Sequence, residues 1–146
     1  MTTWLNTPIQ MQFRIIDGRA DPRQIVAGAL SGVERYSLPD AVREDYLRAY
    51  EGDRMAESMR YVRAYLAELP ALRDLLPQVQ TPVQIIASAR DPAVPPVNAE
   101  FLHHRLPRSK LDILDAGHFT WEDATDQYAA LITTLGDRGT TVRSAQ

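Results

Sequence analysis

The chain contains no cysteine and no long apolar run. Without cysteine it can form no disulfide, offer no thiolate nucleophile and bind no cysteine-ligated zinc. No stretch approaches the roughly 20 apolar residues that a membrane-spanning helix needs. The first thirty residues contain several charged side chains and no apolar segment typical of a signal peptide. We therefore expect a soluble, cytoplasmic protein that does not bind membranes.

Basic residues are too few and too scattered for a nucleic-acid-binding surface. The chain has 16 lysines and arginines against 19 aspartates and glutamates, with both signs interspersed and a formal net charge of −3. A nucleic-acid-binding protein normally shows a basic patch or stripe. Hydrophobic residues make up 45% and charged residues 24% of the 146 positions, an ordinary globular composition.

Histidine is scarce as well, which limits metal binding. His103 and His104 are adjacent, so on a helix their side chains would point about 100° apart and could not easily share an ion. His118 is the third and last histidine. We therefore expect no metal site.

Residues 1–77 are predicted to be mainly helical. Residues 9–15 alternate apolar and polar side chains, which favours an N-terminal strand over 9–16, with an irregular entry into a helical region as the alternative. Helices are then expected from Pro22 to about Leu30, from Pro39 to near Gly52, and after Asp53. In the third helix, spacings of four and three predict a buried stripe that Pro70 ends or kinks, formed by Met55, Met59, Val62, Leu66 and Leu69.

Residues 78–136 instead alternate strands and helices. The apolar run 83–87 and residues 110–115 are predicted strands, and 98–106 and 120–135 are predicted helices, with Phe101, Leu102 and Leu106 facing inward. This order implies two parallel strands joined by a crossover helix. The predicted fold class is therefore α/β, a helical half followed by a βαβα unit, with a flexible tail over 137–146.

Two candidate catalytic residues follow the two predicted strands. Asp91 comes shortly after the first strand, and His118 lies in "DAGHFTWED" after the second. Because the carboxyl ends of parallel strands meet at one sheet edge, we expect the two side chains to be neighbours. An aspartate that accepts a hydrogen bond from Nδ1–H fixes the imidazole tautomer and leaves Nε2 as a general base. The structural alternatives are a turn histidine that bonds backbone carbonyls and an aspartate that caps its own loop.

Two carboxylates follow the histidine directly, Glu122 and Asp123. Paired carboxylates can perform acid–base chemistry, but these two lie in the first turn of a predicted helix, where negative charge favours the helix dipole. Thr120 and Asp123 form a near capping box there.

Two segments, "PVQIIASARDPAVPP" and "LPRSKLDILDAGHFTWED", resemble the last two core strands of the α/β-hydrolase family. In that family the acid commonly lies in a G-x-x-D-like turn after the seventh strand, and the histidine in a G-H turn after the eighth. Asp91 and Gly117-His118 match these positions, while Ser88 stands where the family usually has glycine. Residues 20–76 resemble the cap domain that precedes those strands in the epoxide-hydrolase and haloalkane-dehalogenase branches.

The resemblance implies hydrolysis of an ester, epoxide or carbon–halogen bond in a small-molecule substrate, through a covalent intermediate and with no cofactor. Asp91 and His118 would be catalytic. The cap would close a substrate pocket whose candidate wall residues are Met55, Met59, Tyr61, Tyr65 and Trp121.

The family's G-x-S-x-G nucleophile elbow, or its aspartate counterpart, and the oxyanion-hole loop are both missing. The nearest string, "GALSGV", has Ala29 two places before Ser31 and Val33 two places after, and it lies at a predicted helix end. The resemblance therefore covers the carboxyl-terminal half only, and the expected hydrolase would be inactive without an amino-terminal half. The alternative is a non-catalytic homo-oligomeric scaffold or a small-molecule-binding module derived from a hydrolase.

Two parallel strands make a marginal sheet by themselves. The unpaired edge of the 83–87 strand would be a template for another chain. Residues 9–15 could fold back onto it, two copies could pair, or a separate amino-terminal half could complete it. We therefore expect a homo-oligomer or a complementing amino-terminal half as the partner.

Overall fold

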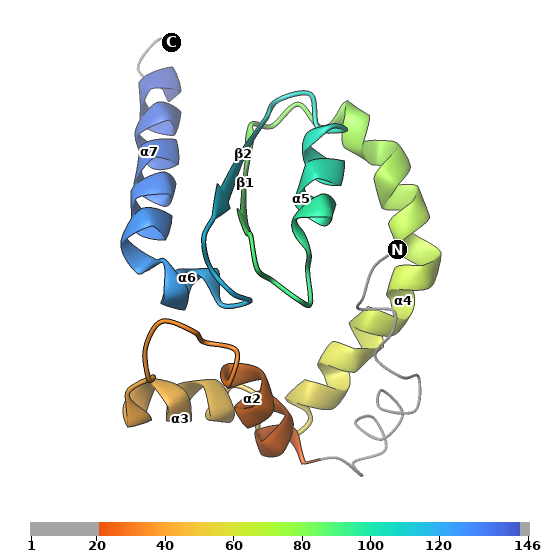
Figure 1. The fold of residues 1–146 in the computed structure, drawn as a ribbon. Helices are drawn as coiled ribbons and strands as arrows, with labels where there is room; N and C mark the ends of the chain where they lie inside the picture. Colours follow the sequence, from red (N-terminus) through yellow and green to blue (C-terminus); the bar gives the residue numbers. More distant parts are fainter. Residues whose placement is uncertain (1–20, 144–146) are drawn as a thin grey trace. The chain divides into compact units, whose positions relative to one another are not determined.

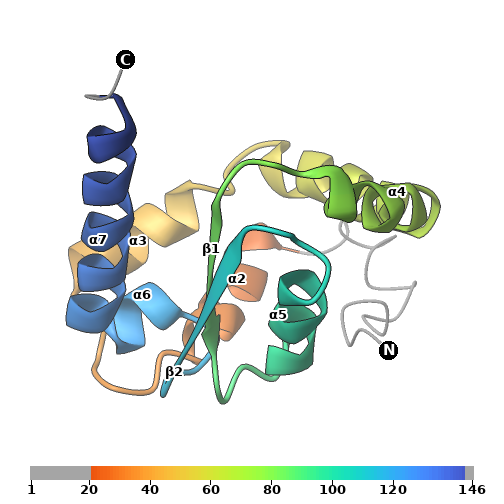
Figure 2. The ribbon, with the colours of Figure 1, turned by 90° about the horizontal axis from the view of Figure 1, so that it is seen from above.

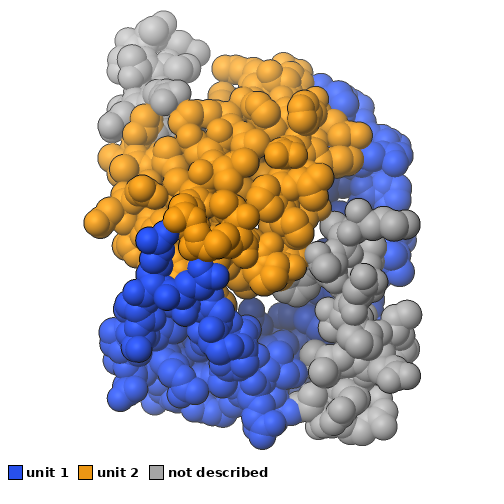
Figure 3. Space-filling view, viewed as in Figure 1, with its two compact units in different colours: residues 1–78 blue, residues 79–146 orange. Residues whose placement is uncertain are grey.

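The computed structural model describes residues 21–143, with side chains through residue 134. Residues 1–78 and 79–146 form two compact units, coloured separately in Figure 3. The predicted strand 9–16 lies outside the described residues. The described elements, shown in Figure 1, are α2 (Pro22–Leu30), α3 (Asp40–Arg48), α4 (Arg54–Leu75), the short 3₁₀ helix η2 (Leu76–Gln78), β1 (Val83–Ser88), α5 (Pro96–His103), β2 (Ser109–Leu114), α6 (Thr120–Asp123) and α7 (Thr125–Arg143).

Helix α2 begins and ends where local sequence signals predict. The Asp21 carboxylate accepts a hydrogen bond from the Arg23 N–H (2.9 Å), and Pro22 occupies the first helical turn, where no N–H partner is needed. The chain turns after Leu30, where the Gly32 N–H donates to the Ala29 carbonyl (2.9 Å). These are interactions between residues a few positions apart, so the sequence alone is enough to specify them.

Helix α4 differs from its prediction. Met55 is buried and Met59 half-buried, but Leu66 is 71% exposed and Leu69 is exposed as well, so the predicted buried stripe is wrong beyond the first turns. Regular spacing shows that side chains share a helix face, but it does not supply a surface to cover that face.

Of the two outcomes predicted for Pro70, an end or a kink of the helix, the end is wrong, because α4 continues through this residue to Leu75. Proline removes one N–H donor from the helix, but the five residues that follow it include alanine, two leucines and arginine, which have high helix propensity. Figure 1 shows α4 curving along its length.

Residues 83–114 form the predicted parallel pair of strands. Val83 pairs with Ser109 and Ser88 with Leu114, in continuous parallel register. The crossover helix α5 packs against both strands, as Figures 1 and 2 show. The α/β class and the parallel topology predicted from the sequence are therefore confirmed.

The crossover helix begins and ends earlier than predicted, at Pro96 and His103. The inward orientation predicted for Phe101 is wrong: its ring is exposed, with the Arg105 guanidinium 3.6 Å from the ring centroid, and Ala99 is the buried residue of the helix. The smaller alanine side chain allows close packing, while the guanidinium covers part of the ring.

The last predicted helix is two helices. The backbone leaves helical geometry at Ala124 (φ −133°, ψ 42°), which separates α6 from α7. Helix α7 continues to Arg143, beyond the predicted start of the tail at 137. No helix among residues 21–143 is both long enough and apolar enough to span a membrane.

Candidate active site

The candidate residues lie in two turns that follow β1 and β2, the acid turn (residues 89–94) and the histidine turn (residues 115–119). Parallel pairing continues beyond the strands, because the Ala89 N–H donates to the Leu114 carbonyl (2.8 Å) and the Arg90 N–H to the Ala116 carbonyl (3.1 Å). Ala116 is fully buried. The two turns are therefore joined through their backbones before any side chain is considered.

The structure brings Asp91 and His118 into contact, as the sequence predicts. His118 Nδ1 lies 2.9 Å from Oδ2 of Asp91 and 3.0 Å from Oδ1. An ionised carboxylate can only accept hydrogen bonds, so Nδ1 is the donor and carries the proton. This bond fixes the imidazole tautomer and makes Nε2 the basic ring nitrogen.

The Asp91 carboxylate is itself held in place. Its Oδ1 accepts hydrogen bonds from the backbone N–H groups of Ala93 and Val94, both at 2.8 Å. The Asp91 side chain is only 9% exposed, whereas that of His118 is 31% exposed. The loop-capping alternative for Asp91 is thus also realised, and the same oxygen that orders the loop orients the carboxylate toward the imidazole.

Two buried hydroxyls connect the acid side of the site to the histidine side. Ser88 Oγ, at the end of β1, lies 2.5 Å from Thr120 Oγ1, at the start of α6. The two side chains are 3% and 8% exposed. The one sequence signal for this contact is Ser88 at a position where the resembled family usually has glycine, and nothing in the sequence identified Thr120 as its partner.

Asp123 has a different role from the predicted capping box. Its Oδ2 accepts a hydrogen bond from the Gly117 N–H (3.0 Å), and the side chain is 8% exposed. Phe119, not Thr120, precedes the first helical residue, and no side chain caps α6. Thr120 lies inside the helix, so its hydroxyl cannot act as the predicted cap. Asp123 instead fixes the residue directly before His118.

The predicted pocket-wall residues do not share one surface within either unit. Met55, Met59, Tyr61 and Tyr65 lie on α4 in the first unit, and Trp121 lies on α6 in the second. On an ideal helix the tyrosine pair points about 120° away from the methionine pair. Tyr61 is 73% exposed. Their role as pocket walls stays a prediction.

Trp121 belongs to a row of aromatic rings that begins at the histidine. The ring of Phe119 lies edge-on to His118 (centroids 5.3 Å apart) and to Trp121 (5.8 Å). Phe119 is buried while Trp121 is exposed. A hollow of about 350 Å³ within residues 79–134 contains none of the predicted site residues. It is lined by Asp112, Ile113, Leu114, Gln127, Ala130, Leu131 and Thr134.

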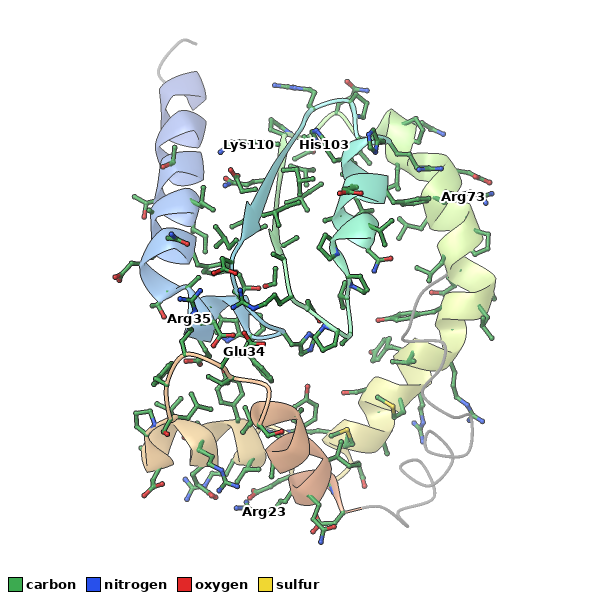
Figure 4. All side chains as sticks on the ribbon, in the orientation of Figure 1. Arg23, Glu34, Arg35, Arg73, His103 and Lys110 are labelled. Atoms are coloured by element: carbon green, nitrogen blue, oxygen red, sulfur yellow. The ribbon has the colours of Figure 1, made fainter. Side chains whose placement is uncertain are left out.

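The other two histidines lie where α5 ends: His103 is its last residue and His104 follows it. Figure 4 shows His103 and Lys110 at the end of the strands where β2 begins. His103 Nδ1 lies 2.9 Å from Ser109 Oγ. Among residues 21–134 no cluster of three metal-ligating side chains is found.

No protein-family model and no curated protein matches the sequence. Solved structures do match the fold. An esterase from Exiguobacterium antarcticum is 17% identical with a TM-score of 0.66, and the match covers 86% of this chain and 47% of the esterase. A hydrolase from Pseudomonas aeruginosa is 21% identical with a TM-score of 0.61, covering 88% and 51%. An α/β hydrolase enzyme from the metagenome of lagoon sediments at Mar Chica, Morocco, is 24% identical with a TM-score of 0.50, covering 72% and 48%.

The chain spans about half the length of each of these structures. That share is consistent with the carboxyl-terminal half of the fold, which the resemblance at Asp91 and Gly117-His118 implies. The chain therefore has the α/β-hydrolase fold in part.

Proposed function

We propose that this chain carries the acid, Asp91, and the histidine, His118, of a nucleophile–histidine–acid triad in a hydrolase. The observation that carries the proposal is the Nδ1–carboxylate hydrogen bond of 2.9 Å between two turns that the parallel strands bring to one edge. A carboxylate in this position stabilises the imidazolium that forms when Nε2 accepts a proton.

For an ester substrate the reaction has two stages. The nucleophile's oxygen bonds to the carbonyl carbon while its proton passes to Nε2 of His118; the imidazolium then gives that proton to the departing alkoxide as the carbon–oxygen bond breaks. Water next loses a proton to Nε2 and attacks the acyl group. The acid is released, and the proton returns to the nucleophile's oxygen.

The matched structures favour an ester as the substrate, because one of them is an esterase. An epoxide or a carbon–halogen bond would use the same histidine and acid with a carboxylate nucleophile. In every case the substrate is a small molecule, and none of the proposed steps uses a cofactor.

The nucleophile and the oxyanion hole would come from a completing segment, which we propose to be an amino-terminal half. Within residues 21–143 the sheet consists of β1 and β2 alone, and a sheet of two strands is marginal. The completing half would supply a strand beside β1 as a sheet partner, and elsewhere in its sequence it would carry the nucleophile. A triad that lacks its nucleophile loses on the order of 10⁴ to 10⁶ in rate.

To test this proposal, the chain is expressed alone and together with the segment encoded immediately upstream of it, and hydrolysis of a short-chain p-nitrophenyl ester is measured. The completed protein should hydrolyse the ester, and His118→Ala should lower kcat about 10⁴-fold. His103→Ala removes an imidazole at the other end of the strands and should leave kcat unchanged.

The chain alone should be no faster than its own His118→Ala variant. Equal kcat in the completed protein and its His118→Ala variant would contradict the proposal. That result would favour the alternative, a non-catalytic homo-oligomeric scaffold or a small-molecule-binding module derived from a hydrolase.

A further inference from the structure

The buried polar side chains of the chain gather around the two turns of the candidate site. Among residues 21–134 they are Ser88, Thr120 and Asp123. Ser88 lies three residues before Asp91, and Thr120 lies two residues after His118. Buried polar groups are costly unless they are hydrogen-bonded, so their concentration at one place calls for a physical reason.

The Ser88–Thr120 contact is the one described hydrogen bond between side chains of β1 and α6. One hydroxyl donates and the other accepts, at 2.5 Å. Away from water such a bond is directional and strong, and losing either partner leaves the other unsatisfied. This hydrogen bond therefore fixes the distance between the end of β1, which leads into the acid turn, and the start of α6, which follows the histidine turn.

Asp123 fixes the histidine turn in a second way. Its carboxylate holds the Gly117 N–H at 3.0 Å, and Gly117 is directly bonded to His118. An ion pair between the two turns, Arg90 with Asp115, lies at the surface, where ion pairs contribute little to stability. The backbone hydrogen bonds of Ala89 and Arg90 set the register of the turns, and the buried side-chain contacts, more than this ion pair, constrain the residues beside Asp91 and His118.

We propose that Ser88 and Thr120 are positioning residues, and that their hydroxyl pair sets the approach of His118 to Asp91. This proposal deepens the proposed function and rests on it. Neither hydroxyl is assigned contact with substrate; each acts through the imidazole. A displacement of 1 Å in a catalytic group can lower a rate about 10²-fold, so a contact that prevents such displacement matters to a triad.

The test reads the imidazole directly by NMR. The ¹⁵N shifts of the two ring nitrogens report the tautomer and hydrogen bonding of each histidine in the full chain. In Ser88→Ala and in Thr120→Val, the His118 shifts should move toward those of the exposed His104, while the His103 shifts stay in place. The double variant should move them no further than either single variant, because both remove the same bond.

Ser109→Ala is the matched control, since it deletes a serine hydroxyl bonded to a different histidine. It should move the His103 shifts and leave those of His118 unchanged. If Thr120→Val loses the dispersed amide spectrum of the folded chain, Thr120→Ser, which keeps the hydroxyl, is compared with Ser88→Ala instead. The serine variant should then leave the His118 shifts in place.

His118 shifts that stay in place in Ser88→Ala would overturn the proposal, as would equal displacement in Thr120→Ser and Ser88→Ala. The readout is the state of the ring and not turnover. Failure of the positioning role is therefore distinguishable from failure of the proposed hydrolase function, which the ester assay tests separately.

Discussion

The two units of the chain differ in whether polar side chains are buried. In the first unit the buried side chains are apolar, Val26, Leu30, Leu47, Met55 and Leu76, and the polar contacts are exposed. There Arg23 of α2, labelled in Figure 4, lies in an exposed group of ion pairs. Its guanidinium donates to Glu44 of α3 at 2.8 and 3.2 Å and to Glu51 at 3.4 Å. The second unit has exposed polar contacts as well, but it also has buried ones, Ser88–Thr120 and Asp123–Gly117, and these lie near the carboxyl ends of β1 and β2.

This difference distinguishes side chains that only pack the fold from side chains that hold other groups in a fixed geometry. Exposed ion pairs contribute little to stability and tolerate change, whereas a buried hydrogen bond allows one geometry and is costly to break. The second unit has such bonds at the place where an imidazole and a carboxylate must be held at a fixed distance. The first unit, whose buried side chains are apolar, has no comparable requirement among its described residues.

The largest expected effect on stability lies in the first unit. Leu47 is buried, and Leu47→Ala leaves a cavity, so the free energy of unfolding should fall by about 2–5 kcal/mol. Urea denaturation measures this loss. The ¹⁵N shifts of the His118 ring in the folded variant should match those of the parent chain, because hydrogen bonds among residues 88–123 hold this ring. Shifts that move in Leu47→Ala would contradict the contrast drawn between the two units.

A smaller loss is expected from Asp123→Ala in the second unit. The Gly117 N–H would lose its acceptor while buried, which lowers the free energy of unfolding by about 1–3 kcal/mol. Here, unlike in Leu47→Ala, the His118 shifts should also move. Asp123→Asn keeps an amide oxygen for the Gly117 N–H and should restore most of the stability; an asparagine variant as unstable as the alanine variant would show that the carboxylate's charge is what matters.

The smallest effect concerns the exposed ion pairs. The hydrogen bond from Arg23 lowers the pKa of Glu44 below its ordinary value and outweighs the opposing effect of desolvation. This contact therefore stabilises the fold above the ordinary glutamate pKa of about 4.3, and the stabilisation is lost as pH falls through the lowered pKa. Glu44→Gln should make stability between about pH 5 and 3 slightly less dependent on pH, measured by urea denaturation at each pH.

Asp74→Asn is the control for that series. The hydrogen bond from Arg73 lowers the pKa of Asp74 in the same direction, but the two residues are adjacent in sequence. Their proximity persists in the unfolded chain, so the substitution should change the pH dependence less than Glu44→Gln does. A larger change for Asp74→Asn would contradict this explanation.

The elements predicted correctly are those with short-range or topological causes. The start of α2 is specified locally: the Asp21 side chain accepts a hydrogen bond from a backbone N–H two residues further on, and Pro22 occupies the first helical position. The contact of Asp91 with His118 follows from strand order alone, since parallel strands place their following turns at one edge. The pair could therefore be predicted without any knowledge of packing.

The features that the sequence did not predict depend on contacts between residues far apart in the chain. The exposed Leu66 has helical spacing without a surface to cover it. Nothing in the local sequence predicts the break at Ala124. Ser88 and Thr120 meet only because the strands pair in one particular register. No pattern within either segment indicates that contact.

The most direct test of the Asp91–His118 pair is the ring tautomer of His118 in Asp91→Asn. Oδ1 of Asp91 is held by two backbone N–H donors, so an asparagine should keep its carbonyl oxygen there and turn its NH₂ group toward Nδ1. We expect Nδ1 to accept from this NH₂ group, because Oδ2, at 2.9 Å, is the nearer of the two oxygens to Nδ1. The ring proton should then move from Nδ1 in the parent chain to Nε2 in the variant, as read from the ¹⁵N shifts. The same tautomer in both proteins would contradict the account.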